Sequence, residues 1–263
     1  MAIHPTAVLH PSLETPADLE VGAYAVVDRD VILAPGLRIG PFCHVYPGTI
    51  FEPGVRLEDG VSLGNLPQDL KYRGEATAVR VGAGAWLREY VTVNRATAAS
   101  GTTLIGPGAL IMAYAHVAHD CAIGERAVIA NGVQMGGHVR VGPGAVVSGM
   151  TGIHQFVSVG AGAFVGGNLR VDKDVLPFSK ALGEPLRYAG LNAIGLARAG
   201  FGPDAGDWLR DFYRAFSEAG KAAALAAFRE GGPGGDAEAA RLRAILADFL
   251  GGQTRGLLTR PTA

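Results

Sequence analysis

From Ile123 to Arg170 the sequence reads as consecutive hexads: IGERAV, IANGVQ, MGGHVR, VGPGAV, VSGMTG, IHQFVS, VGAGAF and VGGNLR. The same phase extends beyond this stretch, since 25 of the 29 positions reached in steps of six from Ile3 to Val171 are Val, Ile, Leu, Met or Phe. The exceptions are Thr15, Asp69, Glu75 and Ala99. A period of six fits a coil of short strands that each point one large apolar residue inward. The sequence therefore predicts a left-handed parallel β-helix with 18 residues, or three hexads, per turn.

The fifth position of each hexad is usually small, and both cysteines of the chain, Cys43 and Cys121, fall there. This position points into the coil two residues before the next large one. We therefore interpret both cysteines as buried core residues, without a disulfide, a zinc site or a catalytic thiol. Glycines at the second and fourth positions are expected at the corners, where the backbone turns sharply.

Two stretches interrupt the repeat, Asn65 to Arg80 and Asn94 to Leu104, and the hydrophobic phase resumes after each. We interpret them as loops that project from the coil, because loops on a rigid scaffold commonly carry function.

The period ends near Leu176, and segments rich in Ala, Leu, Arg and Glu follow. Residues 207–219 and 236–250 are predicted to be amphipathic helices, with GGPGG at 231–235 as a breaker between them. We therefore predict a β-helix domain over residues 1–182 and a small C-terminal α-helical domain over residues 183–263.

The composition excludes several classes of protein. The chain has 263 residues, is 48% hydrophobic and carries a net charge of -1, so it can bury a sizeable core but lacks the basic excess of a nucleic-acid-binding protein. No basic segment followed by an apolar stretch opens the chain, and no run approaches the ~18 apolar residues of a membrane span. We expect a cytoplasmic protein with no membrane span and no nucleic-acid partner.

Residues 18 apart lie one above another in such a coil, at about 4.8 Å. This register stacks Gly137 on His119 and His138 on Asp120. It also brings three further polar residues close by: His116, His154 and Gln155. An imidazole can remove a proton from a hydroxyl or amine as it attacks an acyl carbonyl, and a glycine N–H can hold the developing oxyanion. The cluster therefore predicts acyl transfer with His119 as base and Gly137 as oxyanion donor.

A zinc site is the alternative interpretation of this cluster, because three or four histidines on adjacent coils are a familiar ligand set. Activity that is retained after chelation would favour acyl transfer with His119 as base, and lost activity would favour the zinc site. We expect neither a metal nor another cofactor.

Five motifs carry a family resemblance: PQDLKYRGE at 67–75, AHVAHDC at 115–121, SGMTGIHQF at 148–156, VGG at 165–167 and QTRGLL at 253–258. In these motifs, and over nearly its whole length, the sequence resembles the UDP-N-acetylglucosamine O-acyltransferases that begin lipid A biosynthesis. The resemblance implies a homotrimer with active sites between subunits. It also implies that a 3-hydroxyacyl chain passes from acyl carrier protein to the 3-position of UDP-N-acetylglucosamine or of its 3-amino analogue.

The resemblance implies roles for individual residues. His119 would be the general base, Gly137 N–H would hold the oxyanion, and Asp120 would orient His119, which requires a corner between these neighbours. Glycine at Gly167 would leave the acyl groove open for long chains. In the trimer, the loop with Asp69 would reach a neighbour's His119. Substrate contacts are implied for Gln68, Asp69, Lys71, His116, His138, His154, Gln155, Gly167, Asn192 and Arg198.

Three positions depart from the family pattern and leave nucleotide recognition open. Ile194 and Ala199 stand where an acidic and a basic residue are usual, and Asn94 stands where histidine is common.

Two other functions share part of this pattern. The N-acyltransferase that acts later in the same pathway usually has an additional N-terminal domain, whereas the repeat here begins at Ile3. A metal-binding β-helix protein of the carbonic anhydrase type has ligand histidines five apart, whereas the residue five after His116 is Cys121.

Overall fold

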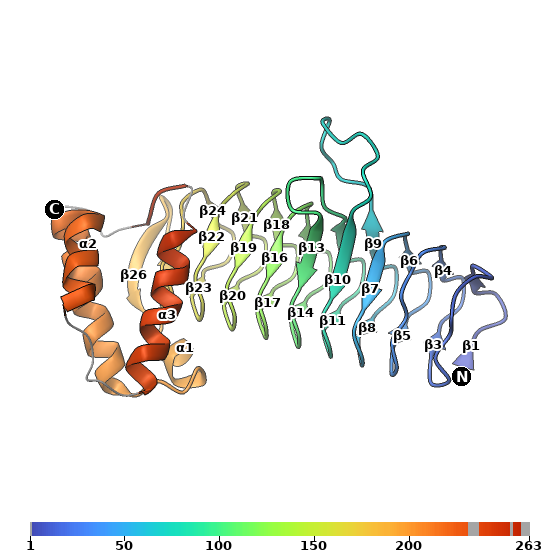
Figure 1. Cartoon of the computed structure of the whole chain (residues 1–263), viewed down its shortest axis with the longest axis horizontal. Helices are drawn as coiled ribbons and strands as arrows, with labels where there is room; N and C mark the ends of the chain where they lie inside the picture. Colours follow the sequence, from blue (N-terminus) through green and yellow to red (C-terminus); the bar gives the residue numbers. More distant parts are fainter. Residues whose placement is uncertain (1, 231–236, 253–254, 259–263) are drawn as a thin grey trace.

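The chain forms a long solenoid of short strands with three helices gathered at its C-terminal end (Figure 1). A computed structural model describes residues 2–230, 237–252 and 255–258. The predicted breaker at 231–235 and residues 253–254 of the tail motif lie outside the described residues. The predicted fold class, a left-handed parallel β-helix followed by a small helical part, is confirmed.

Three sheets run along the solenoid, and the chain visits them in the order A, B, C. Sheet A consists of β1(Ala2–Ile3), β3(Glu20–Val21), β5(Arg38–Ile39), β8(Arg56–Leu57), β11(Trp86–Leu87), β14(Leu110–Ile111), β17(Val128–Ile129), β20(Val146–Val147), β23(Phe164–Val165), β25(Ser179–Leu182) and β26(Arg187–Leu191). Sheet B consists of β2(Val8–Leu9), β4(Val26–Val27), β6(His44–Val45), β9(Ser62–Asn65), β12(Thr92–Asn94), β15(His116–Val117), β18(Gln134–Met135), β21(Gly152–Ile153) and β24(Arg170–Val171). Sheet C consists of β7(Thr49–Phe51), β10(Ala78–Val81), β13(Thr102–Ile105), β16(Ala122–Ile123), β19(Arg140–Val141) and β22(Ser158–Val159). Neighbouring strands pair in parallel, except for the antiparallel pair of β25 and β26.

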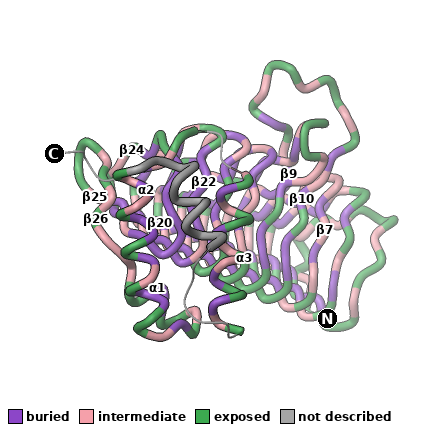
Figure 2. The backbone as a smooth tube through the Cα atoms, turned by 60° about the vertical axis from the view of Figure 1, so that its left-hand side comes forward, coloured by how far each residue is buried: buried purple, intermediate pink, exposed green. Residues whose placement is uncertain are grey.

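The hexad residues form the core of the solenoid, and Figure 2 shows the buried backbone along its interior. Val117, Ile123 and Ile129, for example, are each 0% exposed. Cys43 and Cys121 are also buried, and burial raises the pKa of the Cys121 thiol to about 12. The prediction that both cysteines are inert core residues agrees with these surroundings.

The two interruptions of the repeat are loops whose lengths keep the coil in register. Most paired residues are 18 apart, as Leu104 and Ala122 are, but Thr49 pairs with Val79 and Ala78 pairs with Thr102. The loop over 66–77 therefore adds two hexads to its coil, and the loop over 95–101 adds one. This explains why the hydrophobic phase resumes after each, and the longer loop rises clearly between β9 and β10 in Figure 1.

Glycine is needed at the corners for two different reasons. The fourth hexad position has positive φ, as at Gly144 with φ +64°, although Asp120 and Met150 also adopt this conformation there. The second position requires space instead, because a Cβ on Gly142 would lie 2.4 Å from the backbone nitrogen of Ala161 on the next coil.

This difference predicts the stability of two neighbouring alanine variants. Gly142→Ala is expected to lower the free energy of unfolding by about 1–3 kcal/mol, because a backbone clash between coils must be relieved. Gly144→Ala has nothing within 4 Å of its new Cβ and is expected to cost about 1 kcal/mol from the positive φ alone. Urea denaturation of both variants would check this order, and a larger loss in Gly144→Ala would contradict it.

The C-terminal part caps the last coils. It contains α1(Ala193–Arg198), α2(Pro203–Glu230) and α3(Ala237–Gly251), and β26 also falls in the segment predicted to be helical. Leu209 from α2 and Leu246 from α3 pack with Phe178 from the end of the solenoid, and the Tyr213 hydroxyl donates to Pro177 O at 2.6 Å. The five residues of β26 were too few to show a strand period in the sequence. The domain boundary after residue 182 stays a prediction.

Among the described residues, no helix is both long and apolar enough to cross a membrane.

Candidate active site

His119 and Asp120 lie together at the corner that joins sheet B to sheet C, between β15 and β16, which we call the B–C corner. Asp120 takes the fourth hexad position with φ +60°, so its side chain turns to the same side as that of His119. The Nδ1 atom of His119 lies 2.7 Å from Asp120 Oδ2. The structure therefore has the corner that a His–Asp pair of sequence neighbours requires.

The Asp120 carboxylate is surrounded by hydrogen-bond donors from the loop over 95–101. Its oxygens accept hydrogen bonds from the backbone and hydroxyl groups of Thr97 and Ser100, and the side chain is 0% exposed. Burial alone would raise the pKa of this carboxyl, but the hydrogen bonds from Ser100, His119 and Thr97 outweigh it and lower the pKa to about 2. Asp120 is therefore ionised at neutral pH and accepts a hydrogen bond from His119 Nδ1–H.

Gly137 lies against the other edge of the His119 ring. A Cβ added there would come within 2.4 Å of His119 Cε1 and 2.6 Å of Nε2. The Gly137 carbonyl accepts a hydrogen bond from Phe156 N, whereas its N–H donates none within the described part of the chain. Gly137 thus touches the His119 ring and has an N–H without an acceptor among the described residues, which suits an oxyanion donor next to a base.

Two further histidines flank this pair. His138 stacks on Phe156, with ring centroids 4.4 Å apart, and its Nε2 is 3.7 Å from Asp120 Oδ2. Burial and the neighbouring His119 lower the pKa of His138 against the opposing effects of Asp120 and Asp69. Burial and His119 also lower the pKa of His116. Both rings are thus biased toward the neutral form, which can hydrogen-bond a polar ligand.

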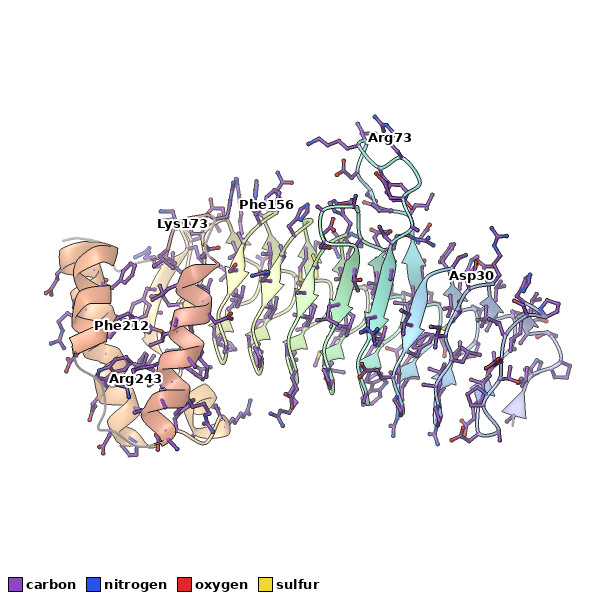
Figure 3. The ribbon with its side chains drawn as sticks, viewed as in Figure 1. Asp30, Arg73, Phe156, Lys173, Phe212 and Arg243 are labelled. Carbon is purple, nitrogen blue, oxygen red and sulfur yellow. The ribbon has the colours of Figure 1, made fainter. Side chains whose placement is uncertain are left out.

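The loop over 66–77 rises from this same B–C corner. Figure 3 shows Phe156 and Lys173 along one edge of the solenoid, with Arg73 near the tip of the loop above that edge. Asp69 is close enough to raise the pKa of His138 in its own chain, and its carboxylate accepts from Lys71 N at 2.8 Å. Within one chain the loop leaves the solenoid at β9 and re-enters it at β10, and the expectation that it reaches a neighbour's His119 stays a prediction. Gln68 is exposed on the same loop.

His154 and Gln155 lie at the B–C corner one coil beyond Gly137 and His138, and the C-terminal tail reaches His154 there. Residue 257 forms a parallel bridge with Asp174, and the Arg255 guanidinium lies 3.1 Å from His154 Nδ1. The tail thus contributes a cation to the surroundings of His154.

Other predicted residues lie at different corners of the chain. Gly167 follows β23 at the corner from sheet A to sheet B, where a Cβ would be 3.1 Å from Gly149 O. The Asn192 side chain donates to Gly162 O at the corner from sheet C to sheet A. Arg198 lines a cleft of about 930 Å³ beside α3, and His119 is not among its lining residues. One chain therefore does not bring Gly167, Asn192 or Arg198 to His119.

The cluster also bears on the metal hypothesis. One ligand atom from each of His119, Asp120 and His138 lies within 4.8 Å of the others. However, both Asp120 oxygens already accept hydrogen bonds, and His119 Nδ1 is one of the donors. A metal would have to displace these contacts, so the donor set fits a hydrogen-bonded His–Asp pair better.

Four residues near the site were missed from the sequence: Thr97, Ser100, Phe156 and Arg255. Phe156 could have been predicted, because it lies 18 residues after His138 and the register stacks the two. Thr97 and Ser100 lie in a break of the repeat, and Arg255 lies in the tail, so the register gives no place for them.

Comparison with known proteins agrees with this architecture. A family model for UDP-N-acetylglucosamine O-acyltransferase, domain 2, matches residues 174–258, and a model for six bacterial transferase hexapeptide repeats matches residues 102–137. The acyl-[acyl-carrier-protein]–UDP-N-acetylglucosamine O-acyltransferase of Thermodesulfovibrio yellowstonii is 40% identical, with 81% of this chain and 83% of the relative covered. The enzyme of that name from Thiobacillus denitrificans is 37% identical, with 97% and 98% covered.

Solved structures give the same result. The UDP-N-acetylglucosamine acyltransferase of Francisella novicida superposes with a TM-score of 0.91 at 28% identity, over 99% of this chain and 95% of that one. The corresponding protein from Campylobacter jejuni has a TM-score of 0.84 at 31% identity, over 98% and 99%. Because relatives above 30% identity cover nearly the whole chain, the predicted family is confirmed, and the chain belongs to the UDP-N-acetylglucosamine O-acyltransferases.

Proposed function

We propose that this chain transfers a 3-hydroxyacyl group from acyl carrier protein to the 3-position of UDP-N-acetylglucosamine, the first step of lipid A biosynthesis. The observation that carries the proposal is the B–C corner, where the His119 ring lies between the ionised Asp120 and Gly137, whose N–H donates no hydrogen bond within the described residues. We also propose that the reaction takes place in the cytoplasm, as the sequence predicts.

The chemistry follows from the positions of these groups. Asp120 accepts a hydrogen bond from His119 Nδ1–H, so Nε2 carries the free lone pair that takes the proton of the sugar 3-hydroxyl. The oxygen then attacks the thioester carbonyl, and the N–H of Gly137 stabilises the negative oxygen of the tetrahedral intermediate. When the intermediate collapses, the C–S bond breaks and the carrier thiolate takes the proton back from His119. The products are the acylated sugar nucleotide and the carrier thiol.

Mass spectrometry of the products tests this function. The protein is offered UDP-N-acetylglucosamine or its 3-amino analogue, together with carriers loaded with 3-hydroxyacyl chains of different length. We expect a sugar nucleotide heavier by one 3-hydroxyacyl group. Acylation of the amino analogue alone would show that the acceptor is the 3-amine, and the absence of product with every pair would oppose the proposal. The same assay would give the preferred chain length, for which an open groove at Gly167 stays a prediction.

We also propose that the active unit is a homotrimer with each site between two chains. His119 lies at the B–C corner, whereas Asn192 and Arg198 lie at the corner from sheet C to sheet A. A cyclic trimer sets one corner of each three-sided coil against a different corner of its neighbour. Exposed apolar side chains on the solenoid, including Phe42 and Met150, would be covered by such packing.

Mixing two inactive variants tests this arrangement. His119→Ala and Arg198→Ala are each expected to be nearly inactive, but a mixed trimer contains some interfaces with both residues intact. Random mixing in equal amounts should restore activity at about a quarter of the sites. Native mass spectrometry would verify the mixed trimers. If verified mixtures recover nothing, the site lies within one chain, and a monomeric protein would contradict the proposal outright.

A further inference from the structure

We propose that Thr97 and Ser100 are positioning residues for acyl transfer, because together they clamp the Asp120 carboxylate against Nδ1 of His119. Both residues belong to the loop over 95–101, which lengthens one coil by a single hexad. The proposal rests on the role of His119 proposed above, and it assigns a function to a loop outside the hexapeptide repeat.

The clamp consists of hydrogen bonds to both carboxylate oxygens. Asp120 Oδ1 accepts from Ser100 Oγ at 2.5 Å and Ser100 N at 3.2 Å. Asp120 Oδ2 accepts from Thr97 Oγ1 at 2.8 Å and from His119 Nδ1 at 2.7 Å. The Thr97 N–H lies between the two oxygens, at 3.1 and 3.2 Å. A carboxylate offers about four lone-pair positions, so this one cannot rotate without losing bonds.

The loop and the corner backbone are themselves fixed in place. Gly101 N donates to Thr97 O at 2.9 Å, which closes the loop on itself. Asp120 N donates to Thr103 Oγ1 at 2.9 Å, which ties the corner to the strand that follows the loop. Asp120 is therefore held from the backbone side and from the carboxylate side. A rigid acceptor fixes both the orientation and the tautomer of the imidazole that donates to it.

The charge on Asp120 depends on this clamp. The described titratable groups that face the carboxylate are His119, His138 and the buried Cys121 thiol. Burial favours the neutral carboxyl, and the hydrogen bonds from Ser100, His119 and Thr97 reverse that preference. Without the two hydroxyls, burial acts with less opposition and the pKa of Asp120 rises. At pH values below this raised pKa, the protonated carboxyl would no longer support a positive charge on His119 during proton transfer.

Pairs of variants separate positioning from packing. Thr97→Val removes the hydroxyl at nearly constant shape, and Thr97→Ser keeps it. Ser100→Ala removes the second hydroxyl, and Ser100→Thr keeps it.

Thr97→Val and Ser100→Ala are each expected to lower kcat about 10- to 100-fold, as losses of groups that orient an active-site ligand typically do. KM for both substrates should change little, and the acid limb of the kcat profile should move to higher pH. Ala99→Ser, on the exposed face of the same loop, is the matched control.

A second readout needs no substrate. Nitrogen-15 chemical shifts of the His119 ring in the full chain should show Nδ1 protonated and Nε2 unprotonated in the unmodified protein and in Thr97→Ser. Thr97→Val and Ser100→Ala should show a mixture of tautomers. If the unmodified protein makes no acylated product, the proposed function fails, and the ring nitrogens still decide whether the clamp exists.

Two results would overturn the inference. The first is a kcat within about twofold of the unmodified protein in both hydroxyl-deleted variants, with an unchanged pH profile. The second is an equal loss in Thr97→Val and Thr97→Ser that follows a drop in melting temperature, because this would show that Thr97 acts through packing.

Discussion

Gly137→Ala is expected to lower kcat about 100- to 1,000-fold, although it adds only a methyl group and keeps the backbone N–H. The new Cβ would lie 2.4 Å from His119 Cε1, closer than two carbons can approach, so the imidazole must move away from its position between Asp120 and Gly137. A displacement near 1 Å commonly costs about 100-fold in rate. The loss should appear in kcat, because binding contacts elsewhere are unchanged.

Steady-state kinetics and thermal melting of Gly137→Ala would check this prediction. The melting temperature should change little, since the ring can move outward without disturbing the apolar core. A kcat close to that of the unmodified protein would show that the His119 ring can accommodate the added methyl group without losing activity. The close approach of Gly137 would then have no part in catalysis.

The 18-residue register is the reason why much of the site could be predicted. It stacks Gly137 on His119 and His138 on Asp120, and the structure has both neighbours in contact. The register works because parallel strands of adjacent coils pair residue by residue, so sequence spacing fixes spatial distance. The same reasoning predicted the corner at Asp120 as the condition for a His–Asp pair, and its positive φ meets that condition.

Residues outside the register could not be placed in the same way. Thr97 and Ser100 occupy the added hexad, where no strand on the next coil sets their position. Arg255 approaches His154 from 101 residues further along the chain, which no local pattern indicates. The loop with Asp69 also lies outside the register, and its approach to a neighbouring chain stays a prediction, while within its own chain Asp69 is close enough to raise the pKa of His138.

His119→Ala is expected to have the largest effect of any single substitution. Asp120 holds the ring through Nδ1, so Nε2 is the basic atom at the corner, and alanine leaves no group to accept the proton of the attacking hydroxyl. Loss of a general base typically lowers the rate about 100- to 10,000-fold. Folding should be little affected, because the side chain lies at a corner outside the apolar core formed by Val117 and Ile123.

The role of His119 as the base for acyl transfer to the sugar nucleotide can be tested by the rate of product formation by His119→Ala. The acylated sugar nucleotide is measured by mass spectrometry with saturating acyl carrier protein and UDP-N-acetylglucosamine, beside the unmodified protein and the control His10→Ala on the exposed first coil. We predict a His119→Ala rate at least about 100-fold below the other two, with an unchanged melting temperature. A His119→Ala rate above about a tenth of the unmodified rate would contradict it.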